Sequence, residues 1–589
     1  MCESVPGRST TIARRREEYA DVTAQPALRS LSYSSGTSDT PLIGLTLGDS
    51  LAAATAAHPD RDALVDVASG RRWTYAALDE DTRALAVALV ERGLEPGDRV
   101  GIWAQNVPEW TLVMYAVARA GGILVNINPA YRGHELEYVL EQNGTKVLIT
   151  QIADPHADFL GMANEAAGRS AGLEVLALDT VPGPLGAAAD ARIRTEQSFA
   201  HLWERGRALL AEPGAQWATR LRRIEDEISA DDPVNLQYTS GTTGFPKGVT
   251  LSHHNILNNG FSIGGLLGYT EQDVVVLPVP FFHCFGMVIG TLAIVSHGAC
   301  AVIPAASFDP SATLRAVAQE RATSLYGVPT MFIAELALTD FDDYDLGSLR
   351  TGVMAGSTCP VEVMRQVIDR MHMTEVAICY GMTETSPVST MTRVDDSLQR
   401  RTETVGRVMP HVEVKVVDPV TGRTVPRGVK GEVRTRGYSV MLGYWGEPDR
   451  TAEAIDAGRW MRTGDLGIMD EDGYLDITGR IKDMVIRGGE NIYPREIEEF
   501  FHRHPGIRDI QVVGVPDEKY GEELMAWVVA AEGYDSLTAE DLRAFARDHL
   551  AHYKIPRYVE VRDGFPMTVS GKVRKVELRE EGARLVAGV

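Results

Sequence analysis

The sequence predicts an α/β protein in which a large N-terminal domain of doubly wound sheets carries a β-rich subdomain and precedes a small α+β domain. Apolar strand-like runs alternate with helix-like runs up to about residue 410, which is typical of parallel sheets. Period-two alternation with turn signals follows, and a compact segment of strands and helices ends the chain. With 589 residues, 44% of them hydrophobic, the chain can bury more than one core.

The first α/β stretch runs from about residue 51 to 151. It contains a strand and turn, a helix with Pro108 in its first turn, and a second strand, which are DRVGIWAQN, PEWTLVMYAVARAG and GILVNINP. Residues 152–230 are rich in Ala and Gly, and we expect peripheral, partly helical elements there.

The βα alternation resumes from Asp231 to about Pro410. Three apolar strands each run into a loop rich in Gly, Ser and Thr, in ATSLYGVPTMF, LRTGVMAGS and EVAICYGMTET. Such loops at the carboxyl ends of parallel strands bind ligands. The charge-free run 274–308 invites a membrane-spanning interpretation, but prolines, glycines and histidines interrupt it. We therefore expect a strand, a loop, a buried helix and a strand.

The β-rich subdomain is predicted from HVEVKVVDPVTGRTV, GEVRTRG and GYLDITGR, with turns at Asp418-Pro419 and Asp472-Gly473. Beyond it we expect strands at IRDIQVVGVPD, ELMAWVVAA and YVEVRDG, a helix that starts at Thr538 with Asp541 at its third position, and a helical tail. The predicted boundaries are a flexible extension at 1–45, the large domain at 46–479, a hinge at 480–483 and the small domain at 484–589.

The composition excludes several classes of protein. A net charge of −23 argues against nucleic-acid binding, so an anion site must be built from local donors. Five widely spaced cysteines without a CxxC pair indicate reduced core thiols, and they are Cys2, Cys284, Cys300, Cys359 and Cys379. The polar N-terminal segment has arginines but also acidic residues, and it has no apolar run. We therefore expect neither a transit peptide nor a signal peptide, and we expect the protein to be cytoplasmic.

The most informative segment is YTSGTTGFPKGV at residues 238–249, between an apolar strand and the helix that Ser252 is expected to cap. Glycines let backbone approach an anion, and hydroxyls and an ammonium add donors. The predicted phosphate-binding residues are Thr239, Ser240, Gly241, Thr242, Thr243, Gly244 and Lys247. The segment is not the P-loop of kinases and GTPases, because Pro246 precedes the lysine and Gly248 follows it.

The segment resembles the phosphate-binding signature of the adenylate-forming (AMP-binding) superfamily, which includes acyl-CoA synthetases, luciferases and the adenylation domains of peptide synthetases. Further motifs occur in the family's order, and the resemblance covers about residues 45 to 580. It is closest to the medium-chain fatty-acid:CoA ligases, through RGGENIYP, SYSSGTSDTPL and MLGYWGEP.

The resemblance implies roles for the nucleotide-binding residues. In YGMTE, Tyr380 would meet the adenine, Thr383 the α-phosphate and Glu384 a magnesium ion, which proteins usually hold by a carboxylate together with phosphate oxygens. In the TGD motif Asp465 would accept the ribose hydroxyls, and Arg480 would join it there.

It also implies roles around the acyl group and CoA. Lys572, in PMTVSGKVRK, would bridge the substrate carboxylate and the α-phosphate and offset their charge. His283, in PFFHCFG, would lie near the acyl carboxylate, with a core histidine as an equal alternative. Lys482 would be the pivot of the hinge. Gly488 and Gly489 would let the pantetheine arm pass close to backbone.

The predicted function is therefore that of an AMP-forming, ATP-dependent acid–thiol ligase in fatty acid metabolism. It would form acyl-CoA from a medium- to long-chain fatty acid, ATP and CoA through an acyl-adenylate, with Mg²⁺ as cofactor and with release of AMP and pyrophosphate. ATP and CoA are co-substrates. We expect no nucleic-acid partner and no transmembrane segment, and the sequence leaves peripheral membrane contact and oligomeric state open.

Four alternatives remain beside this prediction. Amino-acid adenylation domains place an aspartate in the region of His283, and a luciferase-type oxidase shares every motif. A ligase that loads carrier proteins is a third alternative, although no insertion near the hinge is evident. An adenylate-binding regulator without turnover is the fourth, and it would not need Lys572, Glu384 and Asp465 intact.

Overall fold

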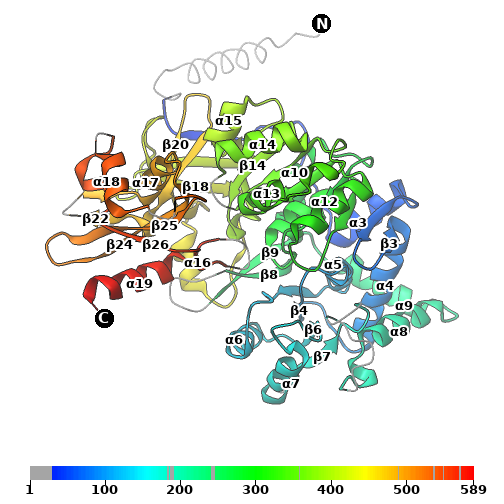
Figure 1. The fold of residues 1–589 in the computed structure, drawn as a ribbon. Coiled ribbons are helices and arrows are strands. Elements are labelled where there is room, and N and C mark those ends of the chain that lie inside the picture. Colours follow the sequence, from blue (N-terminus) through cyan, green and yellow to red (C-terminus); the bar gives the residue numbers. More distant parts are fainter. Residues whose placement is uncertain are drawn as a thin grey trace, which may run out of the picture.

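Four β-sheets organise the part of the chain that the structure describes (Figure 1). Two mixed α/β sheets and a β-rich sheet form the large domain, and the fourth sheet forms the small domain. This computed structural model describes residues 30–170, 172–181, 185, 192–239, 246–356, 359–487, 490–534, 537–547, 549–568 and 572–588. The predicted fold class is confirmed.

The first α/β sheet has the strand order β19-β9-β8-β5-β4-β6-β7 over the described residues. Strands β4 to β8 run parallel, whereas β9 and β19 are antiparallel additions at one edge. The strands are β4 (Arg99–Trp103), β5 (Ile123–Asn126), β6 (Val147–Thr150), β7 (Glu174–Ala177), β8 (Pro233–Thr239), β9 (Lys247–Ser252) and β19 (Gly443–Tyr444).

The helices that accompany this sheet follow from local sequence. Helix α5 begins after Pro108, as expected, because proline fits the start of a helix. Helix α10 begins with a capping box in which Ser252 accepts a hydrogen bond from the N–H of Asn255 and donates its own N–H to the Asn255 side chain. The helices are α3 (Leu47–Ala57), α4 (Tyr75–Glu91), α5 (Glu109–Arg119), α6 (Gly133–Asn143), α7 (Phe159–Arg169), α8 (Phe199–Ala211), α9 (Gln216–Glu227) and α10 (His253–Leu266).

The second α/β sheet has the described order β16-β15-β14-β13-β12-β10-β11-β2-β3 and is parallel from β14 through β2. Its strands are β2 (Asp62–Asp66), β3 (Arg71–Thr74), β10 (Val274–Val276), β11 (Cys300–Ile303), β12 (Ser324–Gly327), β13 (Thr351–Met354), β14 (Glu375–Gly381), β15 (Val388–Met391) and β16 (Arg407–Val408). Its helices are α12 (Pro310–Glu320), α13 (Pro329–Leu336), α14 (Val361–Met371) and α15 (Leu398–Glu403).

One hydrophobic core joins the two sheets. It contains side chains from β4 and β5 of the first sheet, from β10 to β12 of the second, and from helices α5 and α10. The charge-free segment is buried here as β10, the π-helix η3 (Phe285–Leu292), helix α11 (Ala293–Val295) and β11, which confirms the expected strand, loop, helix and strand. Among the described helices, none combines the length and apolar character needed to span a bilayer.

The β-rich sheet has the order β1-β17-β18-β20-β21 in the described chain. Its strands are β1 (Tyr33–Ser35), β17 (Val412–Val417), β18 (Gly431–Gly437), β20 (Met461–Met469) and β21 (Leu475–Arg480), and helix α16 (Pro448–Ala454) leads into β20. The turn at Asp472-Gly473 joins β20 and β21 in the predicted hairpin. This hairpin places Asp465 directly opposite Arg480.

The prediction of a flexible extension over residues 1–45 is wrong for its last part. Strand β1 pairs with β17, Ser32 is fully buried, and the N–H of Ile43 donates to the side chain of Asn258 at 2.7 Å. Backbone pairing to the β-rich sheet and this contact with α10 hold residues 30–45 on the large domain. The residues before position 30 lie outside the described ranges.

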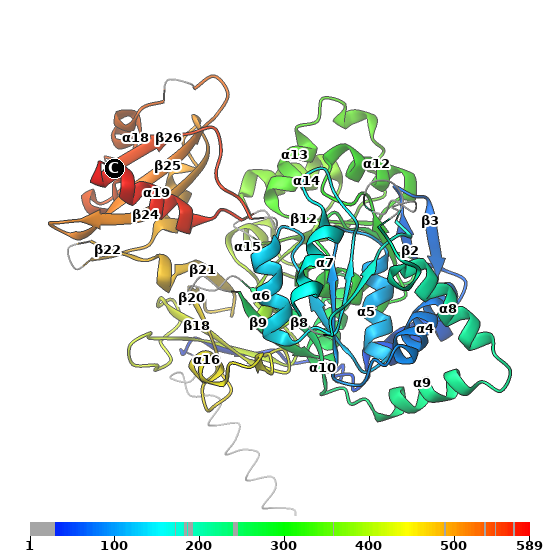
Figure 2. The same ribbon diagram turned by 90° about the horizontal axis from the view of Figure 1, so that it is seen from below.

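The small domain packs helices on both faces of a sheet with the order β23-β22-β25-β24, to which β26 adds beside β25 (Figure 2). Thr538 and Asp541 form the expected capping box of α18. The elements are η6 (Ile481–Asp483), β22 (Val485–Arg487), β23 (Glu490–Ile492), α17 (Pro494–Phe501), β24 (Ile507–Asp517), β25 (Gly521–Ala530), α18 (Ala539–Ala546), β26 (Tyr558–Val561) and α19 (Lys575–Ala587).

Candidate active site

The expected phosphate loop is the tip of a β-hairpin. Strands β8 and β9 are antiparallel, and Thr239 pairs with Lys247 at the last described position of the hairpin. The expected cap at Ser252 is confirmed, but strand β9, which KGVTLS forms between the loop and α10, was not predicted from the sequence. The predicted residues Ser240, Gly241, Thr242, Thr243 and Gly244 lie outside the described residues.

Glu384 lies in a short 3-10 turn after β14 and is almost fully buried, with 6% of its surface exposed. Its Oε1 accepts a hydrogen bond of 2.9 Å from the hydroxyl of Tyr444. The ammonium of Lys247 lies 5.0 Å from the centre of the same tyrosine ring. Burial raises the pKa of Glu384, and the hydrogen bond from Tyr444 and the charges of Lys247 and Arg480 oppose that shift.

Tyr444 is a residue that the sequence reasoning missed. It was part of the motif MLGYWGEP, which carried only a resemblance. Strand β19 pairs Tyr444 with Val249, two residues after Lys247, so this tyrosine lies between the hairpin and the carboxylate. The sequence did not indicate its hydrogen-bond partner, because Glu384 is sixty positions away in the chain.

Asp465 is the centre of a second cluster and is 5% exposed. Its Oδ2 accepts a hydrogen bond of 2.7 Å from the hydroxyl of Tyr380, and its Oδ1 lies 2.9 Å from Nε of Arg480. Burial acts to lower the pKa of Arg480, but the negative charge of Asp465 outweighs it and the net shift is upward. The structure thus brings together a tyrosine, a carboxylate and a guanidinium, as the family pattern implied.

Lys572 reaches this region from the small domain. Its backbone N–H donates to Oγ1 of Thr568 at 2.9 Å. The side chain of Lys572 is exposed, but neighbouring protein desolvates its ammonium and lowers its pKa, and the positive charge of Arg480 adds to the effect. The negative charges of Glu384 and Asp465 in the large domain act to raise the pKa of Lys572.

His283 lies two residues before η3, and its Nδ1 accepts the N–H of Phe285, the first residue of η3, at 3.1 Å. Since Nδ1 is an acceptor, the proton of the neutral ring is assigned to Nε2. Burial lowers the pKa of His283 to about 3, and the positive charge of Lys572 contributes. The imidazole is therefore neutral near pH 7 and presents one N–H donor.

Cys284 lies beside these residues, although the sequence indicated only a core thiol. Its Sγ is 3.5 Å from Nδ1 of His283 and 3.8 Å from Oγ1 of Thr383. Burial raises the pKa of the thiol to about 11, so it is uncharged near pH 7. Of the other cysteines, Cys300, Cys359 and Cys379 are described and are also reduced thiols, and Cys2 is outside the described ranges. Within those ranges no His, Cys, Asp and Glu side chains cluster as a metal site.

The predicted hinge, residues 480–483, begins at Arg480, the last residue of β21. Lys482 lies in the short 3-10 helix η6, and the next residue, Asp483, lies 3.5 Å from the guanidinium of Arg579 on α19. Burial lowers the pKa of Lys482. Gly488 and Gly489 are outside the described residues.

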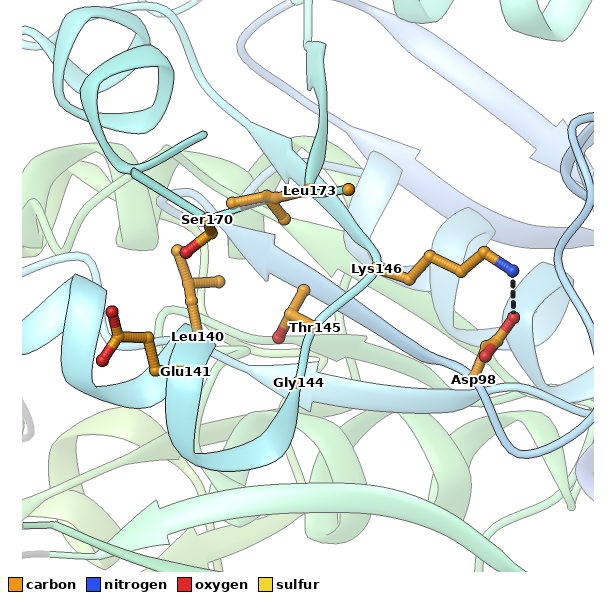
Figure 3. A pocket seen from close by; sticks show the side chains of 9 residues that line it. Asp98, Leu140, Glu141, Gly144, Thr145, Lys146, Ser170 and Leu173 are labelled. Atoms are coloured by element: carbon orange, nitrogen blue, oxygen red, sulfur yellow. Dashed lines mark hydrogen bonds and ion pairs between the residues drawn. The ribbon is translucent and has the colours of Figure 1, made fainter. Parts of the chain in front are cut away.

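A hollow of about 410 Å³ lies apart from these residues (Figure 3). The Lys146–Asp98 ion pair, 2.6 Å long, is part of its wall, and Gly144 and Thr145 at the end of α6 form another part. It lies at the amino end of β6, whereas sheets of this kind bind ligands at the carboxyl ends of their strands. None of the predicted site residues lines it.

Comparison with known proteins places both domains in one family. The AMP-binding enzyme family matches residues 51–445, and the AMP-binding enzyme C-terminal domain matches residues 496–572. A Bacillus subtilis protein named as an acyl-CoA synthetase, YngI, is 47% identical over 547 residues, which are 92% of this chain and 97% of YngI. The mitochondrial medium-chain acyl-CoA ligase ACSF2 of Bos taurus is 43% identical over 560 residues, covering 93% and 89% of the two chains.

Solved structures of similar proteins share the architecture. ATP-bound MatB from Rhodopseudomonas palustris superimposes with a TM-score of 0.76 at 30% identity, covering 91% of this chain and 99% of MatB. The apo form of MatB gives a TM-score of 0.67 over the same shares. The anthranilate CoA ligase AuaEII in complex with anthranoyl-AMP gives 0.76 at 25% identity, over 94% and 99%. The chain belongs to the family of AMP-binding enzymes.

Proposed function

We propose that the protein is an ATP-dependent fatty acid:CoA ligase that forms acyl-CoA through an acyl-adenylate and acts on medium- to long-chain acids. The observation that carries this proposal is the buried carboxylate of Asp465, which the hydroxyl of Tyr380 contacts at 2.7 Å and the guanidinium of Arg480 at 2.9 Å. Relatives that are 40% to 47% identical over most of the chain and are named acyl-CoA synthetases or ligases support the same activity.

In the first half-reaction the carboxylate of the fatty acid attacks the α-phosphorus of ATP and displaces pyrophosphate. Lys572 would lie between these two anions and offset the charge that builds up as they approach. The neutral His283 would donate its Nε2–H to the acyl carboxylate and orient it, and Thr383 would contact the α-phosphate. Thus positioning and electrostatics supply the catalysis.

The nucleotide would be held by residues from all three sheets of the large domain. Asp465 and Arg480 would bind the ribose, and the ring of Tyr380 would lie against the adenine. Lys247 and the hydroxyl-rich tip of the β8–β9 hairpin would hold the β- and γ-phosphates. This assignment agrees with the hairpin register that puts Thr239 and Lys247 at the base of the tip.

Glu384 fits a magnesium site. A carboxylate that joins phosphate oxygens is the usual protein ligand of Mg²⁺. Burial raises the pKa of Glu384 because it removes water from the carboxylate, and a bound divalent cation would stabilise the ionised form. The ion would neutralise phosphate charge when bound, while Tyr444 holds Oε1 of Glu384 in place.

In the second half-reaction the CoA thiol attacks the acyl-adenylate and releases AMP. We propose that the small domain turns about Lys482, so that Lys572 leaves and the Gly488-Gly489 segment covers the site. The predicted cytoplasmic location stays a prediction.

The test is AMP release from ATP, Mg²⁺ and a series of fatty acids from short to long, each with and without CoA. We expect CoA-dependent turnover with an optimum of chain length. Pyrophosphate release without dependence on CoA would instead indicate a carrier-loading or oxidative relative. Lys572→Ala is the inactive variant, and Lys575→Ala is its matched control, because Lys575 pairs with Glu498 inside the small domain.

A further inference from the structure

A small interior cavity lies behind the proposed acyl-carboxylate site. Helix α5 contributes Trp110, Thr111 and Met114 to its wall, and the π-helix η3 contributes Met287 and Thr291. All of these side chains are at least nine-tenths buried. The cavity is therefore inside the core between the two α/β sheets and does not open on the outer surface of these elements.

The cavity is connected to His283 through the backbone of η3. The N–H of Met287 donates to the carbonyl of His283 at 3.0 Å, so Met287 lies one helical turn from the histidine, and Thr291 lies one turn further. Phe281, two residues before His283, completes the wall on this side. Two turns of helix correspond to roughly 10 Å. An acyl chain of that length that started at His283 and followed η3 would bring its distal carbons to the cavity.

Thr111 is the exceptional residue of the wall. It is 3% exposed, and its Oγ1 has no hydrogen-bond partner among the described residues. Buried hydroxyls are normally hydrogen-bonded, because desolvation without a partner is unfavourable. The hydroxyl of Thr291 differs, since it donates to the carbonyl of Gly286 at 3.3 Å. The other side chains named above are aromatic or carry a thioether.

The cavity is small in the present arrangement, about 10 Å³, which is room for about one water molecule. Its two methionines can enlarge it, because methionine is unbranched and adapts its shape at low cost. The Sδ of Met287 lies 3.3 Å from Nδ2 of Asn126 and 3.6 Å from Nε2 of Gln237, which are weak contacts. Displacement of Met287 by an acyl chain would therefore cost little binding free energy.

We propose that this cavity receives the distal end of the acyl chain and that Thr111 makes it selective for fatty acids with a hydroxyl or carbonyl oxygen near that end. The proposal rests on the proposed function. An oxygen on the substrate satisfies the otherwise unpartnered Thr111 hydroxyl, whereas an unsubstituted chain leaves it buried and unpaired. Thr111 is thereby a specificity-determining residue, and the preferred substrates are hydroxy or oxo fatty acids of medium length.

The test compares kcat/KM for AMP release with CoA between an unsubstituted acid and its hydroxy and oxo derivatives substituted next to the terminal carbon. For the wild-type protein we expect a preference of about tenfold for the substituted acids, the effect of one satisfied hydrogen bond. Thr111→Val has nearly the same shape and should abolish the preference. Thr111→Ser keeps a hydroxyl and should retain it.

Thr291→Val is the control within the same cavity, because it removes a hydroxyl that already has a partner, and it should leave the preference in place. Equal kcat/KM for substituted and unsubstituted acids in the wild type, unchanged in Thr111→Val, would overturn the inference and assign the cavity to an ordered water. In that case the proposed function would still stand. Failure of every fatty acid to give CoA-dependent AMP release would instead refute the proposed function.

Discussion

The hydroxyl of Tyr444 donates a hydrogen bond of 2.9 Å to Oε1 of Glu384, across sixty positions of sequence. The same ring lies under the ammonium of Lys247. One tyrosine therefore links the base of the hairpin to the carboxylate proposed to hold magnesium. Burial and the negative charge of Glu384 raise the pKa of Tyr444, so the phenol stays protonated and remains a donor.

Tyr444→Phe should keep the ring and remove the hydrogen bond to Glu384. Because the carboxylate then loses a partner that fixes its orientation, we expect adenylation to slow by about tenfold and to require more Mg²⁺. Titration of pyrophosphate release with Mg²⁺ measures both effects. Tyr474→Phe is a matched control, since Tyr474 donates to Asp396 in the same way but away from the site. An unchanged Mg²⁺ dependence in Tyr444→Phe would remove this tyrosine from the metal site.

Lys572→Ala should suppress formation of the acyl-adenylate by a factor on the order of 100 or more, because the variant lacks the charge that offsets two approaching anions. Conversion of supplied acyl-adenylate to acyl-CoA should be nearly intact, since Lys572 is expected to leave the site for that step. Single-turnover assays of each half-reaction make the comparison. Equal loss in both half-reactions would refute the two-state hinge.

Gly489→Leu should have the opposite pattern, because a side chain at this position would narrow the proposed path of the pantetheine arm. We expect normal pyrophosphate release in the adenylation assay and strongly reduced thioester formation. A normal rate of acyl-CoA formation from supplied acyl-adenylate would exclude Gly489 from the CoA path. The adenylation rate of the same variant is the internal control for folding.

Asp465→Asn should raise the KM for ATP by about 10- to 100-fold, since a charged acceptor is replaced by a neutral one and Arg480 loses its ionic partner. The KM for CoA should change little in the thioester half-reaction started from supplied acyl-adenylate. Asp476→Asn on the adjacent strand is a suitable control, because Asp476 lies in β21 and pairs across the hairpin with Ile468 rather than with the cluster. A KM for ATP unaffected by Asp465→Asn would contradict the proposed ribose contact.

The pH profile of adenylation should be bell-shaped. Lys572 must be protonated and its pKa is lowered from the usual 10.5, so activity should fall on the alkaline side earlier than for an ordinary lysine. Glu384 must be ionised to bind Mg²⁺ and burial raises its pKa from 4.5, so at limiting Mg²⁺ activity should fall on the acid side at a higher pH than for an ordinary glutamate. The pKa of His283, about 3, lies below both limbs.

His283→Gln separates the contributions to the acid limb. Glutamine keeps an N–H donor and does not titrate, so we expect a lower rate with the acid limb in place. Loss of that limb in His283→Gln would show that the imidazole itself titrates. The measurement is pyrophosphate release with saturating ATP across the pH range.

Much of the fold and part of the site could be predicted because their determinants are local. The apolar periodicities placed the strands of both sheets, and the capping residues Ser252 and Thr538 marked the starts of two helices. The turn at Asp472-Gly473 made the hairpin that sets Asp465 opposite Arg480. In these cases the relevant residues are near one another in the chain, so spacing and turn chemistry were sufficient.

The remaining features depend on segments that meet only in the folded chain. Strand β1 docks on β17 across nearly 400 positions, and β19 adds to β9 and brings Tyr444 to Glu384. In the sequence, Thr111 is one polar residue in an apolar helix. In the structure, η3 packs near it and its hydroxyl has no hydrogen-bond partner among the described residues. The sequence by itself therefore determined the elements, their order and the family's motifs. Only the tertiary structure decided which buried polar groups share a site, because burial and pairing are properties of packed surfaces and not of neighbours in sequence.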